Sequence, residues 1–211
     1  MSLTVLRDLA CRRGACALIA IKERSRCKTR LAEVLTQPAR LELARTMLSS
    51  VLHAATMAQT VHTVLVISPE RDTLPADIPV LADTGESLNS ALMQAHRRVR
   101  ESGCQEIVVL PADLPEITAG DIDELVHAGR IGGFAIAPDA AGVGTNALCL
   151  ASPAPFQFQF GPDSHNLHVR EAQRLGLSPR VVRRAGLELD VDLPADLERM
   201  GGQPWLTRLR A

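Results

Sequence analysis

The 211-residue sequence predicts a single three-layer α/β domain, in which helices cover both faces of a mostly parallel sheet. Three observations support this prediction. Short apolar segments rich in Val, Ile and Leu alternate along the chain with longer segments of helical periodicity. The length suits one domain with a sizeable core. The sequence contains no internal repeat or flexible linker, so we expect residues 15–211 to form the domain and residues 1–14 an N-terminal extension.

The first half of the chain begins with strand-like and helix-like segments in alternation. Strands are expected where short apolar runs occur, and helices where apolar residues recur three or four positions apart. Pro38 suits the first turn of a helix, and Gly103 suits the position just after one. The expected elements are, in chain order, strand 15–21, helix 38–56, strands 61–67 and 78–81, helix 88–100 and strand 106–110.

The second half continues the alternation. Thr118 is a plausible N-cap for the helix that follows it. The last predicted strand is long and partly polar, and a final helix follows Pro194. The expected elements are helix 118–128, strands 133–137 and 147–150, helix 164–175, strand 181–191 and the terminal helix.

The composition argues against several classes of function. The formal net charge is −1 and aromatic residues make up 2 %, with no Tyr, so neither a basic field nor stacking platforms favour nucleic-acid binding. The five cysteines include no C-x-x-C pair, and we expect reduced, partly buried thiols. No apolar run approaches the ~20 residues of a membrane span, and the N-terminus has no signal-like apolar core. A cytoplasmic protein without membrane or nucleic-acid partners is therefore expected.

Acidic residues occur near the ends of two predicted strands. Asp113 comes directly after strand 106–110, at the sheet edge where open α/β sheets bind ligands. Asp190 and Asp192 lie two positions apart, so both side chains can point the same way. Converging carboxylates repel one another unless a cation lies between them, and hard divalent cations prefer oxygen ligands. Asp113, Asp190 and Asp192 therefore predict a magnesium site for phosphate chemistry.

A basic segment follows the first predicted strand. Lys or Arg occupies every second position from Lys22 to Arg30. In an extended loop these cations would line one side, which suits a polyanion such as a nucleoside triphosphate. The alternative is a solvated surface loop. The segment contains neither a Walker loop nor a Rossmann fingerprint.

Three other short motifs allow a functional and a structural interpretation. Asn89 could read a base edge or could merely help to start a helix. The turn at 142–146 could bring backbone amides to a ligand or could be a simple turn. The segment 160–164 precedes a helix, where N–H groups suit a phosphate or carboxylate, although Asp163 or Ser164 could be an ordinary N-cap.

Together these motifs resemble one family, the guanylyltransferases that make the activated three-carbon unit of the deazaflavin coenzyme F-420. The resemblance covers the chain from Cys16 to about Met200. It is carried, in order, by K-T-R-L at 28–31, S-L-N at 87–89, P-A-D-L-P at 111–115, G-T-N-A-L at 144–148, F-G-P-D-S at 160–164 with His168, and D-V-D-L-P at 190–194.

The resemblance implies a nucleotidyltransferase fold of the glycosyltransferase-A-like type. It implies magnesium-dependent transfer of GMP from GTP to 2-phospho-L-lactate, phosphoenolpyruvate or 3-phospho-D-glycerate, with the product passed to the next enzyme of the pathway. By the same resemblance, Lys28 and Asp113 are catalytic. The other implied roles are triphosphate binding by Lys28 and Arg30, a position near guanine for Asn89, metal binding by Asp113, Asp190 and Asp192, and acceptor binding by Thr145, Gly161 and Ser164.

The sequence departs from the family pattern at three positions. Ser87 stands where the family pattern usually has Gly. His165 stands where an aromatic residue is common, and Ala140 where a basic residue is frequent. The last two would flank the acceptor, which favours 3-phospho-D-glycerate or phosphoenolpyruvate over 2-phospho-L-lactate.

Two alternatives to this function remain. One is a nucleotidyltransferase for molybdopterin or a sugar phosphate, although the usual Gly-Gly loop of those enzymes is absent after the first strand. The other is a non-catalytic nucleotide-binding regulatory module, which rarely needs three acidic residues at one edge.

Overall fold

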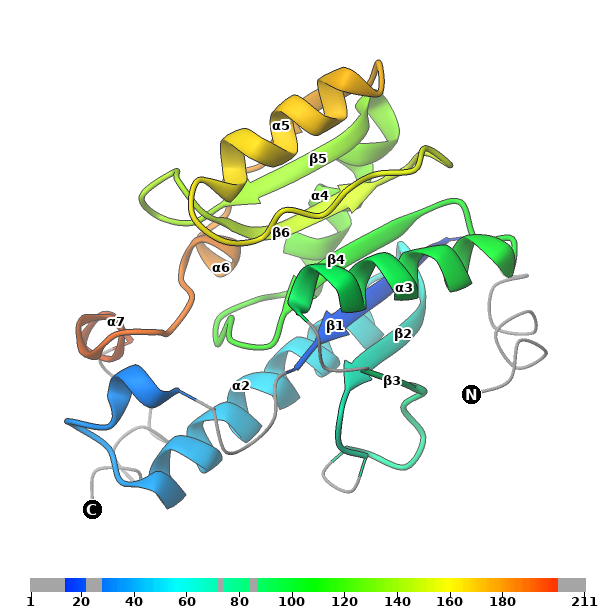
Figure 1. Ribbon diagram of the computed structural model, residues 1–211. Helices are drawn as coiled ribbons and strands as arrows, with labels where there is room; N and C mark the ends of the chain where they lie inside the picture. The colour runs from blue at the N-terminus through cyan, green and yellow to red at the C-terminus, as the bar shows by residue number, and fades with distance from the viewer. Residues whose placement is uncertain (1–13, 22–27, 72–73, 84–86, 201–211) are drawn as a thin grey trace.

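Seven strands form a single sheet in the computed structural model, which describes residues 14–21, 28–71, 74–83 and 87–200. The strands are β1 (Ala15–Ala20), β2 (Val61–Ser68), β3 (Val80–Ala82), β4 (Ile107–Pro111), β5 (Gly133–Pro138), β6 (Thr145–Leu150) and β7 (Ser178–Val181). Their order in the sheet is β3-β2-β1-β4-β6-β5-β7, and β6 alone runs antiparallel to its neighbours (Figure 1). The predicted mostly parallel sheet is confirmed.

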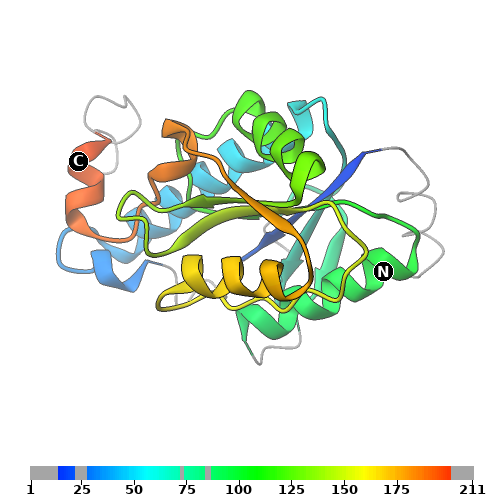
Figure 2. The same cartoon turned by 90° about the horizontal axis from the view of Figure 1, so that it is seen from above.

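Helices cover both faces of this sheet, which confirms the three predicted layers. The four long helices are α2 (Gln37–Met57), α3 (Leu88–Glu101), α4 (Ala119–Gly132) and α5 (Ser164–Arg174). Helices α3 and α5 lie on one face, and α2 and α4 on the other (Figure 2). Short helical segments are η2 (Thr29–Leu31), α6 (Ala185–Glu188) and α7 (Pro194–Arg199). None of the helices in the described ranges is long and apolar enough to cross a membrane.

Local sequence signals set the helix boundaries. Thr118 caps α4 as predicted, and the Asp121 carboxylate accepts a hydrogen bond from the Thr118 N–H. Ser87, the departure from the family pattern, forms a capping box with Ser90 at the start of α3. Helix α4 continues beyond the predicted residue 128 and ends where Gly133 adopts a left-handed conformation, with φ of 79°.

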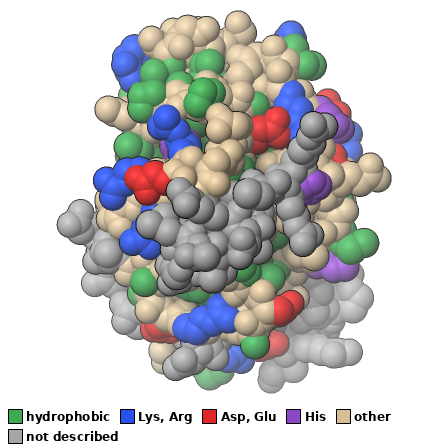
Figure 3. Space-filling model, turned by 90° about the vertical axis from the view of Figure 1, so that its right-hand side faces the viewer, with side chains coloured by type: hydrophobic (Ala, Val, Ile, Leu, Met, Phe, Trp, Pro, Cys, Tyr) green, Lys and Arg blue, Asp and Glu red, His purple; other side chains and the backbone are tan. Residues whose placement is uncertain are grey.

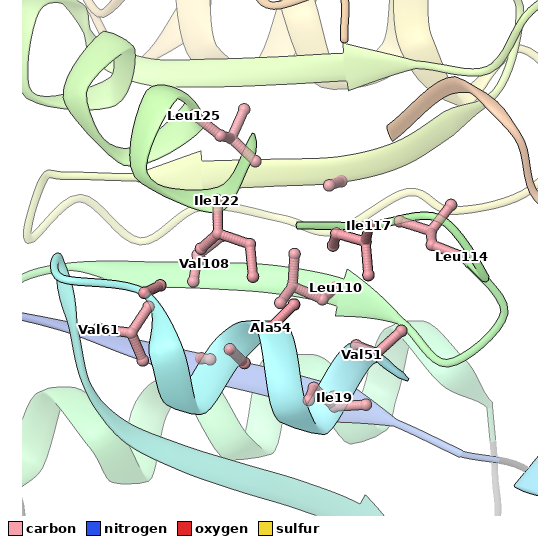
Figure 4. Packing of buried hydrophobic residues seen from close by; sticks show 14 of the residues in the cluster. Ile19, Val51, Ala54, Val61, Val108, Leu110, Leu114, Ile117, Ile122 and Leu125 are labelled. Atoms are coloured by element: carbon pink, nitrogen blue, oxygen red, sulfur yellow. The ribbon is translucent and has the colours of Figure 1, made fainter. Parts of the chain in front are cut away.

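Two apolar clusters hold the layers together. Figure 4 shows the first, in which side chains from α2 and α4 meet the strands; the labelled members are Ile19, Val51, Ala54, Val61, Val108, Leu110, Leu114, Ile117, Ile122 and Leu125. The second cluster packs α3 and α5 on the opposite face and includes the stacked rings of Phe134 and Phe156. The alternation of strand side chains feeds both clusters, because successive residues point to opposite faces.

A third, smaller cluster lies away from the main sheet. It joins η2, the first half of α2 and α7, which Figure 1 shows together beyond the carboxyl end of β1. Its members are Leu31, Leu35, Leu43, Met47, Leu189, Val191, Leu197 and Met200. This cluster anchors two segments that are distant in sequence, residues 28–31 and 189–193, beside each other.

The predicted strand 181–191 is wrong. Strand β7 ends at Val181, and after Val182 donates a last hydrogen bond to the Ile136 carbonyl, the chain forms α6 and then an irregular segment. Gly186 permits this turn, since a Cβ there would lie 2.7 Å from the Glu116 carbonyl oxygen. Leu187 is fully buried by the turn. Tertiary packing therefore outweighs the strand preference of the β-branched residues at 181 and 182.

Other expectations have mixed outcomes. Cys16, Cys104 and Cys149 are buried free thiols, as predicted. Residues 1–13 of the expected N-terminal extension lie outside the described residues, as do Lys22, Arg24, Arg26 and two further cysteines. On the face that Figure 3 shows, the described basic and acidic side chains are interspersed.

Candidate active site

Lys28 joins two of the predicted acidic residues at the carboxyl end of the sheet. Its Nζ lies 2.6 Å from Asp113 Oδ2 and 2.9 Å from Asp192 Oδ1. Arg30 adds a second cation, with Nη1 3.6 Å from Asp192 Oδ2. The Lys28 side chain is 9 % exposed, whereas those of Asp113 and Asp192 are 25 % and 44 % exposed. The lysine therefore lies beneath carboxylates that face solvent. Together with Asp190, these five residues are called the lysine–carboxylate cluster below.

The local backbone explains how Lys28 reaches this position. The alternating cations would line one side of an extended loop, but residues 28–31 are not extended. Thr29–Leu31 form a 3₁₀ turn, and Leu31 is buried in the third cluster. Lys28 adopts a left-handed conformation with φ of 49°. Left-handed backbone in a residue other than Gly costs roughly 1–2 kcal/mol, and such strained residues cluster at functional sites.

Asp190 and Asp192 reach the same place by alternation, although they are not in a strand. Leu189 and Val191 are buried in the third cluster, and the residue after each of them, Asp190 and Asp192, is turned away from it. The Val191 N–H donates to the Asp113 carbonyl at 3.3 Å, so the two acidic segments are bonded directly. The expected convergence of Asp113, Asp190 and Asp192 is found, by a different local structure.

The charges of the cluster shift two pKa values. Burial alone would lower the pKa of Lys28, but the charges of Asp113 and Asp192 and hydrogen bonds to both raise it above its ordinary value. Burial raises the pKa of Asp190, and the nearby charges of Asp113 and Asp192 raise it further. Lys28 is therefore firmly cationic, while Asp190 is ionised at a cost.

These residues fit a divalent cation in their chemistry. The ammonium of Lys28 shows where positive charge is stabilised between two carboxylates, and carboxylate oxygens suit Mg²⁺. Asp190 makes no salt bridge to any described residue. However, no group of three or more His, Cys, Asp or Glu side chains in the described part of the chain is arranged to hold a metal ion. The metal site thus stays a prediction.

A register shift between β5 and β6 positions Thr145 and Asn146. Ala137 pairs with Ala147 but Pro138 pairs with Thr145, so Asn146 is an extra residue. Such bulges redirect neighbouring side chains. Thr145 Oγ1 lies 3.0 Å from His168 Nδ1 on α5, whereas Asn146 Nδ2 donates to the Leu187 carbonyl at 2.8 Å and to Asp190 Oδ1 at 3.4 Å. Two adjacent residues of β6 therefore connect α5 with the lysine–carboxylate cluster.

The loop that carries Gly161 and Ser164 lies beside Thr145. The His165 N–H donates to the Val143 carbonyl at 3.1 Å, which joins this loop to the 142–145 turn. Asp163 has a left-handed backbone, with φ of 58°, and makes no side-chain cap to α5. The first two N–H groups of α5 instead donate to backbone carbonyls, that of Ser164 to Gly161 at 3.2 Å and that of His165 to Val143. The three predicted acceptor residues are thus brought together.

Four partly buried hydrogen bonds from three side chains hold the segment before this loop. The backbone N–H groups of Gln157 and Gln159 donate to Glu171 Oε1 at 3.0 Å and His168 Nε2 at 2.8 Å. Asn89 Oδ1 accepts from the Phe160 N–H at 2.8 Å, and Asn89 Nδ2 donates to the Phe160 carbonyl at 3.0 Å. Asn89, which the resemblance placed near guanine, is therefore engaged with the acceptor-side loop.

Sequence reasoning assigned no role to Asn146 or His168. Both lie in or beside motifs that carried the resemblance, yet a motif alone does not reveal which backbone or side chain each residue contacts. Both side chains are buried, at 6 % and 0 % exposure. Buried polar groups of this kind need partners, and the partners here are distant in sequence.

Comparison with known proteins agrees with this geometry. Residues 15–201 match the family described as "Guanylyl transferase CofC like". The chain is 38 % identical to a phosphoenolpyruvate guanylyltransferase of Rubrobacter xylanophilus, over 87 % of this chain and 92 % of that protein. It is 35 % identical to one of Sphaerobacter thermophilus, over 88 % and 92 %. A structure from Desulfovibrio desulfuricans G20 described as a nucleotide-diphospho-sugar transferase aligns with a TM-score of 0.74 and 18 % identity, covering 92 % and 90 % of the two chains.

Proposed function

The chain belongs to the CofC-like guanylyl transferase family, and on this premise we propose that it transfers GMP from GTP to a three-carbon phosphorylated acid in coenzyme F-420 biosynthesis. The observation that carries the proposal is the lysine–carboxylate cluster at the carboxyl end of the sheet, in a chain with this family's fold. Ligands of open α/β sheets bind at this edge.

The reaction needs no strong general base. A phosphate oxygen of the acceptor attacks the α-phosphorus of GTP, the bond from that phosphorus to the bridging oxygen of the β-phosphate breaks, and pyrophosphate leaves with the electron pair. The attacking oxygen is already anionic at neutral pH. Catalysis therefore depends on alignment of the reacting groups and on stabilisation of negative charge.

Lys28 and Arg30 supply positive charge for the triphosphate in this proposal. Lys28 is held as a cation by Asp113 and Asp192, so a polyanion meets a fixed ammonium group. Asp113, Asp190 and Asp192 would hold Mg²⁺, which when bound neutralises charge on the α-phosphate and on the leaving pyrophosphate. The raised pKa of Asp190 supports this assignment, since a cation would relieve the repulsion among the three carboxylates.

The acceptor would bind at Thr145, Gly161 and Ser164. A three-carbon phosphorylated acid has a phosphate and a carboxylate, and this region offers hydroxyl groups from Thr145 and Ser164. We propose phosphoenolpyruvate as the acceptor because both relatives described above carry that name. The departures at His165 and Ala140 keep 3-phospho-D-glycerate as the closest competitor. Because its substrates are metabolites of the cytoplasm, the proposed place of action is there, and the activated product suits transfer to a following enzyme.

An acceptor screen tests the proposal. The purified full chain is incubated with GTP, Mg²⁺ and each of phosphoenolpyruvate, 3-phospho-D-glycerate and 2-phospho-L-lactate, and pyrophosphate release and product mass are measured. Phosphoenolpyruvate should give the highest kcat/KM, and Asp113→Asn should give no product. GTP binding by calorimetry without turnover on any of the three acids would instead indicate a regulatory module and contradict the proposal.

A further inference from the structure

His168 lies fully buried directly behind the proposed acceptor site. Its exposure is 0 %, and its ring packs against Phe160 and Phe156, with centroid separations of 4.8 and 5.8 Å. Both ring nitrogens have polar neighbours. Nε2 lies 2.8 Å from the backbone nitrogen of Gln159, and Nδ1 lies 3.0 Å from Thr145 Oγ1. The ring therefore connects the acceptor-side loop with the first residue of β6.

The contact with Gln159 determines where the ring proton lies. A backbone N–H can only donate, so His168 Nε2 must accept and cannot carry a proton. Burial, with a smaller contribution from His165, lowers the pKa of His168 to about 4, although Glu171 opposes this shift. The ring is neutral at physiological pH, and its single proton must be on Nδ1.

This tautomer dictates the orientation of the Thr145 hydroxyl. With the proton on Nδ1, His168 donates to Thr145 Oγ1, and the hydroxyl proton cannot point back toward the ring. It must point elsewhere as a donor. An anionic acceptor needs donors, because an oxygen lone pair facing a carboxylate or phosphate would repel it.

We propose that His168 is a positioning residue that fixes the Thr145 hydroxyl as a hydrogen-bond donor to the anionic acceptor. The inference rests on the proposed function for the identity of the ligand, but the tautomer follows from contacts within the protein. It assigns a role in acceptor recognition to a side chain that does not itself touch the acceptor. A purely structural role would be to hold Gln159 in place.

Two substitutions separate these roles. The amide nitrogen of Asn corresponds in position to His Nδ1, and the amide oxygen of Gln corresponds to His Nε2. His168→Asn therefore keeps a donor toward Thr145 and loses the acceptor for Gln159, whereas His168→Gln does the reverse. His168→Gln should raise the acceptor KM about tenfold or more, with the GTP KM within about twofold, because a hydrogen bond to a charged ligand is weakened. His168→Asn should raise the acceptor KM much less.

A double-mutant cycle tests whether the effect passes through Thr145. In a Thr145→Val background, His168→Gln should have no further effect on the acceptor KM, while Thr145→Ser should retain most of the wild-type affinity. Additive effects of Thr145→Val and His168→Gln would overturn the proposal. So would a larger effect of His168→Asn than of His168→Gln, because it would assign the role to Gln159.

A spectroscopic measurement on the wild-type protein is independent of turnover, with His168→Asn used only to identify the signal. Protein labelled with ¹⁵N-histidine should show one ring with a protonated Nδ1 and an unprotonated Nε2 between pH 6 and 8, and this signal should be absent from His168→Asn. A protonated Nε2 on His168 would overturn the inference. Failure of the proposed function is distinguishable, because it would appear as absence of product in the wild-type enzyme whatever the tautomer.

Discussion

Lys28 Nζ donates a 2.6 Å hydrogen bond to Asp113 Oδ2 although 85 positions separate the two residues in the sequence. The contact joins the segment after the first strand to the segment after β4, at adjacent positions in the sheet. The Lys28 ammonium is largely buried between two carboxylates. When a triphosphate binds, this ammonium can replace one of its hydrogen bonds to a carboxylate with one to a phosphate oxygen.

Lys28→Ala should lower kcat/KM for GTP by ~10²-fold or more, with changes in both kcat and KM, because charge on the triphosphate is stabilised in the ground state and on the leaving pyrophosphate. Arg45→Ala is the matched control, since Arg45 is an exposed cation on α2 paired with Glu42. Steady-state kinetics of the two variants would show the contrast. Equal, small losses in both would mean that Lys28 has no specific role.

Asp190→Asn should separate stability from activity. Asp190 is ionised against burial and against two neighbouring carboxylates, so removal of its charge should raise the melting temperature of the ligand-free protein. Turnover should nevertheless fall by ~10²-fold or more in Asp190→Asn, and by a similar factor in Asp192→Asn. Added Mg²⁺ should stabilise Asp190→Asn less than it stabilises the wild type.

Thermal melts with and without Mg²⁺ measure both effects of the Asp190 substitution. Asp77→Asn, at an exposed loop position, is the control. A destabilised Asp190→Asn protein with normal turnover would contradict both the electrostatic analysis and the metal assignment.

Asn89→Ala should affect the acceptor more than GTP. Its amide makes two hydrogen bonds to the Phe160 backbone, so its loss should release the loop that carries Gly161 and Ser164. We expect the acceptor KM to rise about tenfold, since two partly buried backbone groups lose their partner. Met93→Ala, a half-exposed position on the same helix, is the control. If only the GTP KM rose and the preference for GTP over ATP were lost, Asn89 would instead contact guanine, and the prediction would be wrong.

Acid should destabilise the protein through two buried histidines. Burial lowers the pKa of both His96 and His168 to about 4, with smaller contributions from Arg100 and His165 respectively. The unfolded chain, with an ordinary histidine pKa near 6.5, therefore binds more protons than the folded protein below that pH. Stability should fall as the pH falls from 6.5 towards 4, by on the order of 2 kcal/mol per histidine at pH 5.

Urea unfolding of wild type and His96→Phe at pH 7.5 and pH 5 measures this loss. Phe158 packs edge-on against the ring at position 96, so a Phe ring should be accommodated there. The variant should lose less stability on acidification, because it lacks one of the two buried histidines. His53→Gln, at an exposed position, should behave as wild type. The same loss in all three proteins would show that other groups cause the acid sensitivity.

The sequence predicted the sheet, the four long helices and the convergence of the acidic residues because each depends on local periodicity or on the shared edge of parallel strands. It misassigned 181–191 because β-branched residues at 181 and 182 resemble a strand, while Gly186 and the burial of Leu187 belong to contacts made by distant residues. The Asp190–Asp192 alternation survived this error, since burial of Leu189 and Val191 also imposes a two-residue period.

Other features of the site are set by single tertiary contacts. The register shift at Asn146 aims Thr145 at α5, and no local pattern predicts such a shift. The pairing of Asn89 with Phe160 depends on a separation of 71 positions, and the tautomer of His168 depends on the backbone of Gln159. Motifs identified which residues matter, but only the fold shows which atoms they contact.

The most direct test of GMP transfer is to follow two positions of the phosphate label. Parallel reactions contain phosphoenolpyruvate, Mg²⁺ and GTP labelled at either the α- or the γ-phosphate. Attack at the α-phosphorus predicts that the α label appears in the guanylylated three-carbon acid and the γ label in pyrophosphate. Transfer of the γ label to the acid, or retention of both labels in GTP with all three candidate acids, would contradict the account.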